Sequence, residues 1–449
     1  MSDYFKERYC MGKAYSLNEV LNVCFPFALG DSTYESFYVD TNEARGDDAS
    51  KKIILRLRNN GNQIKKILFM GHTGCGKSTE LFKIQNNLSD DYFIVKFSVK
   101  EETDTINFAY SDLIFAILNN IFIAVEKSEE YDLSRFNFNE IISYWNDERV
   151  LNIVNHANID ISSEFEAKVS WFKVLSAKLK GVFQTGVEAK QEIRRKMEPT
   201  LKQLLIYINK FIYDINLQIA PKKLLLIIED LDKLIVGQAK ELFVDNRKII
   251  TALNVNTIYT FPIYLFYSED YSEILSDFDA DVLLSMIKVS NIDGTTFDKG
   301  IQTLTNIVFQ RCDDSLFESN ALDFLIKKSG GSIRDLFWMV NNAALNTLID
   351  KGETGVISLD IAKITYYDFK SRRERIIKKA HLPILIEMYK DKTKKPFGDD
   401  QDLLMQLLHS MCVIEYNGKR WCDLHPAIKD YLIEKGILDE TTRTNGETK

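Results

Sequence analysis

Short apolar runs, rich in β-branched and aromatic residues, alternate along this chain with longer stretches in which apolar residues recur three and four positions apart. The short runs predict strands buried on both faces, and the longer stretches predict helices that cover them. Strands and helices in this alternating order predict an α/β fold with a parallel sheet. We place the five expected strands at residues 67–70, 93–99, 223–228, 258–267 and 285–289.

The same pattern divides the chain into a core that holds the sheet and five additions to it. We expect the core at residues 51–100 and 221–295. The additions, in chain order, are an N-terminal linker (1–50), a helical insertion (101–220), a helical lid (296–379), a C-terminal unit (380–438) and a disordered tail (439–449).

A hairpin is the clearest feature of the C-terminal unit. Asn417-Gly418 separates two short segments with strand character, at 412–416 and 419–422. This dipeptide favours a two-residue hairpin turn because both of its residues adopt positive φ angles readily. Helical patterns precede and follow the hairpin, so we expect a winged helix.

The composition is that of an ordinary globular protein, with 45% hydrophobic and 27% charged residues. The net charge of −8 gives no whole-molecule attraction for nucleic acid or anionic lipid. The six cysteines form no CxxC pair and the histidines show no zinc-ligand spacing, which favours reduced thiols in a cytoplasm. The first eleven residues have no apolar core, so we expect no signal peptide, and no apolar run is long enough to cross a bilayer.

The strongest chemical signal follows the first predicted strand, at Gly71-His72-Thr73-Gly74-Cys75-Gly76-Lys77-Ser78. Glycines in this pattern let backbone N–H groups surround a phosphate at the start of a helix. Lys77 would reach the β- and γ-phosphates, and Ser78 would bind Mg²⁺. We therefore expect ATP with Mg²⁺, held by Gly71, Thr73, Gly74, Cys75, Gly76, Lys77, Ser78, Thr79 and, as argued below, Arg334.

A second signal is the pair of acids that ends the third predicted strand. Glu229 and Asp230 follow five apolar residues, where a carboxylate would hold the metal and a neighbour would polarise the attacking water. Glu229 serves as the metal-side acid and Asp230 as the base, or the metal role moves to Asp230. The sequence leaves this choice open.

With these two motifs in this order, the chain resembles the additional-strand P-loop ATPases, the AAA+ and STAND group. The resemblance implies a P-loop NTPase sheet and an N-terminal linker that touches the nucleotide base. It also implies that Ser268, after the fourth predicted strand, senses the γ-phosphate, and that Arg334, in Gly330-Gly331-Ser332-Ile333-Arg334, contacts the phosphates from the lid. In STAND proteins a winged-helix histidine contacts bound ADP, and His425 stands at the comparable place.

The chain departs from this family at the arginine finger of ring-forming members. Residues 268–287 contain no arginine or lysine and six acids. Arg247 and Arg311 remain as substitutes. We therefore expect hydrolysis that is slow or stimulated by a partner.

These features predict an ATP-binding and ATP-hydrolysing molecular switch. The resemblance to stand-alone bacterial ATPases implies an anti-phage defence system with an effector protein in trans, and a homo-oligomer. One alternative is a nucleotide-dependent scaffold that does not hydrolyse ATP. The other is an origin-recognition-like DNA-binding ATPase.

The predicted winged helix does not favour DNA. The helix before the hairpin carries Asp399, Asp400 and Asp402, where a phosphate-facing helix would be basic. Only Lys419 and Arg420, on the predicted wing, favour DNA. Two further basic stretches lie elsewhere. That at 168–180 predicts a helix packed on its own domain, or a contact with a membrane surface or an acidic partner. That at 370–379 predicts a solvated helix or a nucleic-acid contact.

Overall fold

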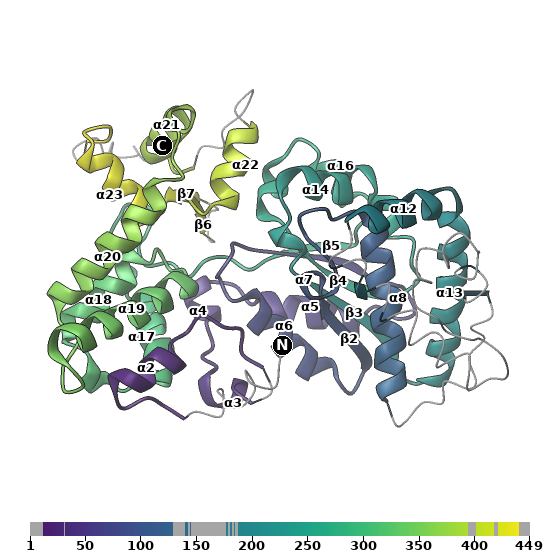
Figure 1. Cartoon of the computed structure of the whole chain (residues 1–449), viewed down its shortest axis with the longest axis horizontal. Helices are drawn as coiled ribbons and strands as arrows, with labels where there is room; N and C mark the ends of the chain where they lie inside the picture. The colour runs from purple at the N-terminus through teal and green to yellow at the C-terminus, as the bar shows by residue number, and fades with distance from the viewer. Residues whose placement is uncertain are drawn as a thin grey trace.

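The computed structural model describes most of the chain. The described residues are 12–30, 32–128, 187–393, 401–416 and 421–439, with isolated positions at 140–141, 144, 177, 180–181 and 184. In Figure 1 the sheet and the helices of the insertion lie on one side, and the lid helices lie on the other. The N-terminal helices run between the two parts.

A five-stranded parallel sheet forms the centre of the core, in the order β2-β3-β4-β1-β5. This confirms the predicted α/β fold. The strand β4 lies between β1 and β3, so the strand before the glycine-rich loop and the strand that ends in acids are not direct neighbours. The strands are β1 (Lys66–Met70), β2 (Tyr92–Ser98), β3 (Lys223–Glu229), β4 (Asn256–Phe261) and β5 (Ala280–Leu283).

Two predicted strands were wrong in extent. The fourth was expected to reach residue 267, but β4 ends at Phe261, because Pro262 lacks an N–H for the ladder and a 3₁₀ helix, η6 (Ile263–Tyr267), follows it. The fifth was expected at 285–289, but the chain pairs with β1 at β5 instead. The acids around β5 obscured it, and as an edge strand it tolerates a polar side chain such as Asp281, which accepts a hydrogen bond from Tyr271.

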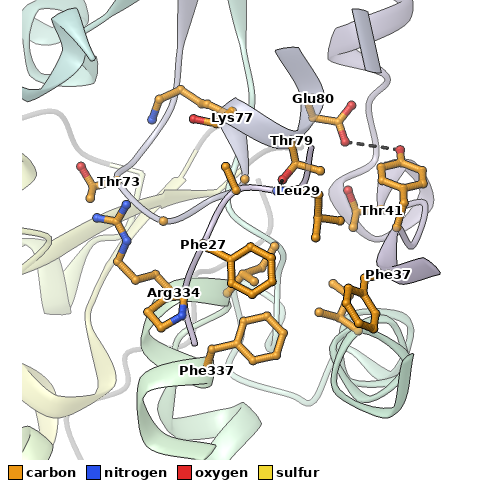
Figure 2. Close-up of a pocket in the computed structure, with 18 of the residues that line it drawn as sticks. Phe27, Leu29, Phe37, Thr41, Thr73, Lys77, Thr79, Glu80, Arg334 and Phe337 are labelled. Atoms are coloured by element: carbon orange, nitrogen blue, oxygen red, sulfur yellow. Dashed lines mark hydrogen bonds between the residues drawn. The ribbon is translucent and has the colours of Figure 1, made fainter. Parts of the chain in front are cut away.

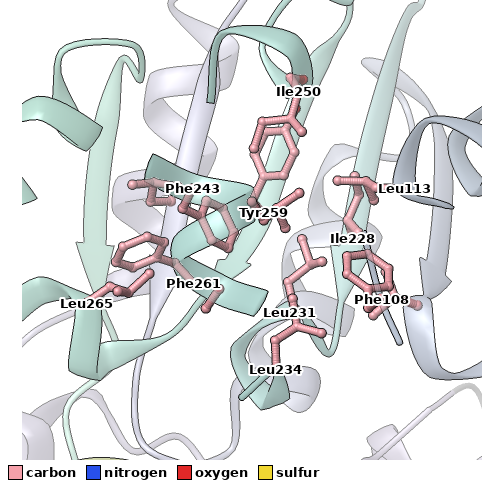
Figure 3. Close-up of a cluster of buried hydrophobic side chains, with 14 of the residues drawn as sticks. Phe108, Leu113, Ile228, Leu231, Leu234, Phe243, Ile250, Tyr259, Phe261 and Leu265 are labelled. Carbon is pink, nitrogen blue, oxygen red and sulfur yellow. The ribbon is translucent and has the colours of Figure 1, made fainter. Parts of the chain in front are cut away.

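Apolar side chains from β3, β4 and the surrounding helices pack into one large core beside the sheet (Figure 3). Tyr259 and Phe261 of β4 are fully buried there, and Phe243 meets Phe261 edge to face at 4.9 Å. The helices around the sheet are α5 (Ala49–Arg58), α6 (Lys77–Leu88), α7 (Val99–Glu102), α8 (Tyr110–Lys127), α12 (Val187–Met197), α13 (Leu201–Gln218), α14 (Val236–Lys240), α15 (Arg247–Ile250) and α16 (Tyr271–Leu275).

The described part of the insertion is helical, as predicted. Helix α13 buries Leu204, Ile208 and Ile215, which recur on one face at helical spacing. The predicted basic helix at 168–180 falls almost entirely outside the described residues.

The lid consists of four helices with a separate core. That core includes Leu336 and Val340 of the third helix and also Leu17 and Val20 from the N-terminal segment. Because residues 300 positions apart share one core, the N-terminal segment is packed against the lid. The helices of this part are α2 (Leu17–Val23), α3 (Tyr34–Phe37), α4 (Asn42–Arg45), α17 (Asp298–Arg311), α18 (Ser319–Lys328), α19 (Ile333–Lys351) and α20 (Leu359–Glu374).

The C-terminal unit contains helices and an antiparallel hairpin whose register pairs Val413 with Leu424. The predicted turn at 417–418 and its basic neighbours lie outside the described residues, as do residues 399 and 400. The elements are α21 (Leu382–Lys390), α22 (Gln401–His409), β6 (Val413–Tyr416), β7 (Trp421–Leu424) and α23 (Pro426–Glu434).

Within the described residues, no helix is both long enough and apolar enough to span a bilayer. The five cysteines among them are buried free thiols.

Candidate functional site

The glycine-rich loop connects β1 to α6, the arrangement that its sequence predicted. Gly74 and Gly76 adopt φ angles of 82° and 105°, which side-chain-bearing residues rarely reach. A Cβ on Gly74 would lie 2.6 Å from the Cβ of Arg334, so the lid approaches the loop at van der Waals contact. The loop therefore requires glycine for its curvature and also for the closeness of the lid.

Lys77 is the first residue of α6, and its ammonium is buried at the base of the loop. Its Nζ donates to the carbonyls of Gly71 at 2.7 Å and His72 at 2.9 Å. It also forms an ion pair with Asp232 at 3.0 Å. Burial alone would lower the pKa of Lys77, but the charge and hydrogen bond of Asp232, together with the charge of Cys75, outweigh burial and raise it. Lys77 is therefore charged and fixed by groups of the chain itself.

Asp232 belongs to a set of three acids at the end of β3, each of which faces a lysine. Glu229 pairs with Lys96 at 3.3 Å, and Asp230 pairs with Lys233. Asp230 also accepts a 2.6 Å hydrogen bond from the Ser98 hydroxyl at the end of β2.

The surroundings shift the pKa values of Glu229 and Asp230 in opposite directions. Burial raises the pKa of Glu229 despite the opposing effects of Lys96 and of a hydrogen bond from Ser78. Burial also disfavours ionised Asp230, but the hydrogen bond and charge of Lys233 and the hydrogen bond from Ser98 lower its pKa overall. Asp230 is thus the more readily ionised of the pair.

Glu229 and Ser78 fit a Mg²⁺ site. The Oε1 atom of Glu229 is buried and has no hydrogen-bond partner among the described residues, so an acceptor is available beside the Ser78 hydroxyl. Mg²⁺ usually keeps several waters and takes only one or two protein oxygens, which suits so small a set. No cluster of three or more His, Cys, Asp or Glu side chains that could enclose a metal occurs in the described part of the chain.

One pocket joins the glycine-rich loop, the end of β3 and the lid. It encloses about 990 Å³ between protein atoms, including space open to solvent. Figure 2 shows its two ends: Lys77 and Thr73 lie at the loop, and Phe27, Phe37 and Phe337 form an aromatic wall at the other end. The polar end suits phosphates, and the aromatic end suits a planar ring.

The structure brings most of the predicted binding residues to this pocket. Arg334 lies at the start of α19 with its side chain toward Thr73 (Figure 2). The predicted residues that line the pocket are Thr73, Gly74, Gly76, Lys77, Ser78, Thr79, Asp230 and Arg334. Gly71, Cys75 and Glu229 lie in or beside the loop without lining it.

Ser268 is not brought to the pocket. It follows η6 and not a strand, and its hydroxyl donates to the carbonyl of Leu265 at 2.8 Å. The polar residue of β4 that does line the pocket is Thr260. Its hydroxyl donates to the carbonyl of Ile228 at 3.1 Å and accepts from the N–H of Leu231 at 3.0 Å. Thr260 therefore holds the backbone on both sides of Glu229 and Asp230.

The two substitute arginines, Arg247 and Arg311, and His425 are also placed away from the phosphate end. Arg247 forms ion pairs with Glu273 and Asp277. Arg311 is buried with its guanidinium carbon 4.1 Å from the ring centre of Phe337, at the aromatic end. His425 faces Asp335 on the lid and does not line the pocket.

Sequence reasoning missed three residues of the site: Asp232, Thr260 and Arg45. Asp232 follows Asp230 by two positions, and a third acid at the end of the same predicted strand was a usable signal. Thr260 was hidden inside a strand predicted too long. Arg45 lies in the N-terminal linker, and no local pattern distinguishes it from a surface arginine.

The C-terminal hairpin contacts the loop and the lid. The buried Nε2 atom of His72 accepts a 2.8 Å hydrogen bond from the N–H of Glu415 in β6. The Tyr416 hydroxyl donates to the carbonyl of Gly330, in the turn before α19, at 2.7 Å. The hairpin therefore bridges the two sides of the pocket.

Three features together identify the fold class: the glycine-rich loop after β1, the parallel sheet, and the position of β4 between β1 and β3. The chain has a P-loop NTPase fold. No protein-family model matches the sequence, and no curated protein matches it.

Three solved structures illustrate the similarity. The structure of Drosophila ORC bound to DNA has a TM-score of 0.40 and 9% identity, over 92% of this chain and 90% of that one. The Thermotoga maritima RuvB Holliday junction branch migration motor has a TM-score of 0.37 and 12% identity, over 89% and 98%. Cdc6p from Pyrobaculum aerophilum has a TM-score of 0.37 and 12% identity, over 90% and 99%. Because these scores are below 0.5, we base function on the residues of the site.

Proposed function

We propose that this protein binds ATP with Mg²⁺ and hydrolyses it slowly, as a switch whose lid and C-terminal unit respond to the nucleotide. The observation that carries the proposal is the convergence in one pocket of a P-loop lysine, acids from the neighbouring part of the sheet and an arginine from the lid. Each comes from a different element, and the chemistry of each suits a triphosphate.

At the phosphate end, the N–H groups of the loop and the N-terminus of α6 would surround the β-phosphate. Lys77 would exchange its contacts with Gly71 and His72 for phosphate oxygens, since an ammonium makes stronger hydrogen bonds to an anion than to a carbonyl. Arg334 would place a second positive charge on the phosphates from the lid. These residues bind and orient the triphosphate.

For hydrolysis, Asp230 is the residue we assign to orient and deprotonate the attacking water. Its low pKa keeps it ionised, and it lines the pocket whereas Glu229 does not. Glu229 and Ser78 would hold Mg²⁺, which neutralises charge on the phosphates when it is bound. Because Asp230 is held by Lys233 and Ser98, it must leave those partners before it acts, which favours slow turnover.

The direct test is Mg²⁺-dependent phosphate release by the purified full chain. Lys77→Ala and Asp230→Asn should each reduce turnover by a factor of about 100 or more, the scale expected when a general base or a transition-state contact is lost. Asp230→Asn should still bind ATP, whereas Lys77→Ala should not. Wild-type turnover equal to that of both variants would refute the assignment.

A scaffold that binds ATP without hydrolysing it is the second candidate. It is favoured by the lysine partners that neutralise all three acids and by the absence of arginine and lysine from 268–287. ATP that remains intact on the wild-type protein, together with an ATP-dependent change in mass by light scattering, would select this candidate over the switch.

The finer proposals concern partners. We propose a homo-oligomer or an effector protein in trans, and an anti-phage role, on the sequence resemblance. Co-expression with the products of adjacent genes, followed by a phage infection assay with wild type and Lys77→Ala, tests both. DNA binding remains the weaker proposal, and fluorescence anisotropy with duplex DNA at low salt tests it directly.

A further inference from the structure

Arg45 is a buried cation that the N-terminal segment contributes to the pocket. Only 2% of its surface is exposed. Its Nε donates to the Thr41 hydroxyl at 2.8 Å, and its two terminal nitrogens donate to the carbonyls of Ser285 and of Cys75, the latter at 2.6 Å. One guanidinium thus ties together the N-terminal segment, the chain after β5 and the P-loop.

The contact with Cys75 fixes the part of the loop that would face a phosphate. The carbonyl of Cys75 and the N–H of Gly76 belong to one planar peptide, so holding the carbonyl on one side sets the direction of the N–H. A Cβ on Gly76 would lie 3.6 Å from a terminal nitrogen of Arg45, so the guanidinium lies directly against this peptide.

The charge of Arg45 is incompletely compensated. Its three hydrogen-bond partners are neutral oxygens, and no carboxylate in the described part of the chain forms an ion pair with it. Burying a charge without a counter-charge is unfavourable. Glu80 and Asp40 act on the guanidinium without forming an ion pair with it, and a phosphate held by the loop would add a negative charge beside it.

A second buried arginine offers a comparison. Arg311 also fastens the N-terminal segment, by donating to the carbonyls of Val23 and Phe25. It lies against the aromatic end, with its guanidinium carbon 4.5 Å from the ring centre of Phe27. The two arginines therefore hold the same segment at opposite ends of one pocket.

We infer that Arg45 is a positioning residue for phosphate binding, which sets the Cys75–Gly76 peptide of the P-loop and offsets phosphate charge. This inference rests on the proposed nucleotide site. It makes the N-terminal segment part of the phosphate-binding end of the pocket as well as of its aromatic end.

The test separates the two ends with three probes: ADP, inorganic tripolyphosphate and adenosine. Binding to the full chain is measured by calorimetry with Mg²⁺. Arg45→Met should lower the affinity for ADP and for tripolyphosphate by about tenfold or more and leave the affinity for adenosine unchanged. Arg311→Met, the matched control, should lower the affinity for adenosine and for ADP and leave the affinity for tripolyphosphate unchanged.

Arg45→Lys keeps the charge but not the three-way geometry, so its tripolyphosphate affinity should lie between those of wild type and Arg45→Met. If circular dichroism shows that Arg45→Met does not fold, the affinities for the three probes are compared on Arg45→Lys instead. Unchanged tripolyphosphate affinity, or an equal loss for adenosine, overturns the inference. If wild type binds none of the three probes, the proposed function itself fails.

Discussion

Lysines and carboxylates at the P-loop form ion pairs with one another. Lys77 is bound to Asp232, and Asp230 to Lys233, at the positions where phosphate and water would be expected. A nucleotide must therefore compete with groups of the protein. The strength of these ion pairs sets how readily a nucleotide can displace them.

Asp232→Asn should raise the affinity for ADP severalfold. The substitution removes a negative charge from a pocket built for anions and releases Lys77 from its ion pair. Fluorescence titration with a labelled ADP measures the effect. Asp323→Asn is the control, because it also removes one carboxylate, but from a surface pair with Lys327 outside the pocket. A weaker ADP affinity in Asp232→Asn would show that Asp232 orients Lys77 for binding and does not restrain it.

At the scale of elements, the start of α19 is held by hydrogen bonds among three buried or partly buried polar side chains, one from each of three helices. Asp335, next to Arg334, accepts from Arg373 of α20 at 2.6 Å and lies 3.3 Å from Nε2 of His425, which caps α23. Because Nδ1 of His425 accepts from the N–H of Ala427, the proton is on Nε2 and points to Asp335. The C-terminal unit thus contacts the residue next to Arg334.

Asp335→Ala should lower the free energy of unfolding by about 3–5 kcal/mol, the usual cost of removing one partner from a buried charged group. It leaves Arg373 and the fully buried His425 without their common acceptor. Urea unfolding followed by tryptophan fluorescence measures the loss. Asp350→Ala, an exposed substitution on the same helix, should change stability little. Equal stabilities of the two variants would contradict the role assigned to Asp335.

At the scale of the whole molecule, the pocket depends on segments far apart in the sequence. The N-terminal segment, the P-loop, the residues after β3 and the lid all line it. The hairpin contacts the loop and the turn before α19. Two buried histidines lie at these junctions: His72 between the loop and β6, and His425 between α23 and the lid. Both are uncharged in the fold because burial lowers their pKa, that of His72 to about 3.

The stability should therefore fall as the pH is lowered through the ordinary histidine range. Below about pH 6.5 the unfolded chain binds a proton at each histidine, whereas folded His72 and His425 do not, so each contributes a slope of up to about 1.4 kcal/mol per pH unit. The slope ends for each group at its folded pKa. Urea unfolding at several pH values from 7.5 to 5 measures it, with His425→Gln as a comparison. An identical slope in that variant would show that His425 titrates normally.

The sequence by itself determined the features that depend on neighbouring residues. The P-loop needs glycines at fixed spacing, and its lysine and serine follow directly, so Lys77 and Ser78 were predicted with their places on α6. The alternation of apolar runs likewise predicted the parallel sheet, and an acid at the end of β3 marked Glu229 and Asp230. Local periodicity and local chemistry suffice for these because each signal lies within about ten residues.

Only the tertiary structure decided which distant groups meet. Arg45 reaches Cys75 and Ser285, Asp232 reaches Lys77, and Glu415 reaches His72. It also decided against Ser268, because Pro262 ends β4 early and places Thr260 at the pocket. Such contacts depend on the order of the strands and on the packing of distant segments. No short sequence pattern predicts either of these. The charges that surround the P-loop are therefore a property of the fold, whereas the loop itself is a property of the sequence.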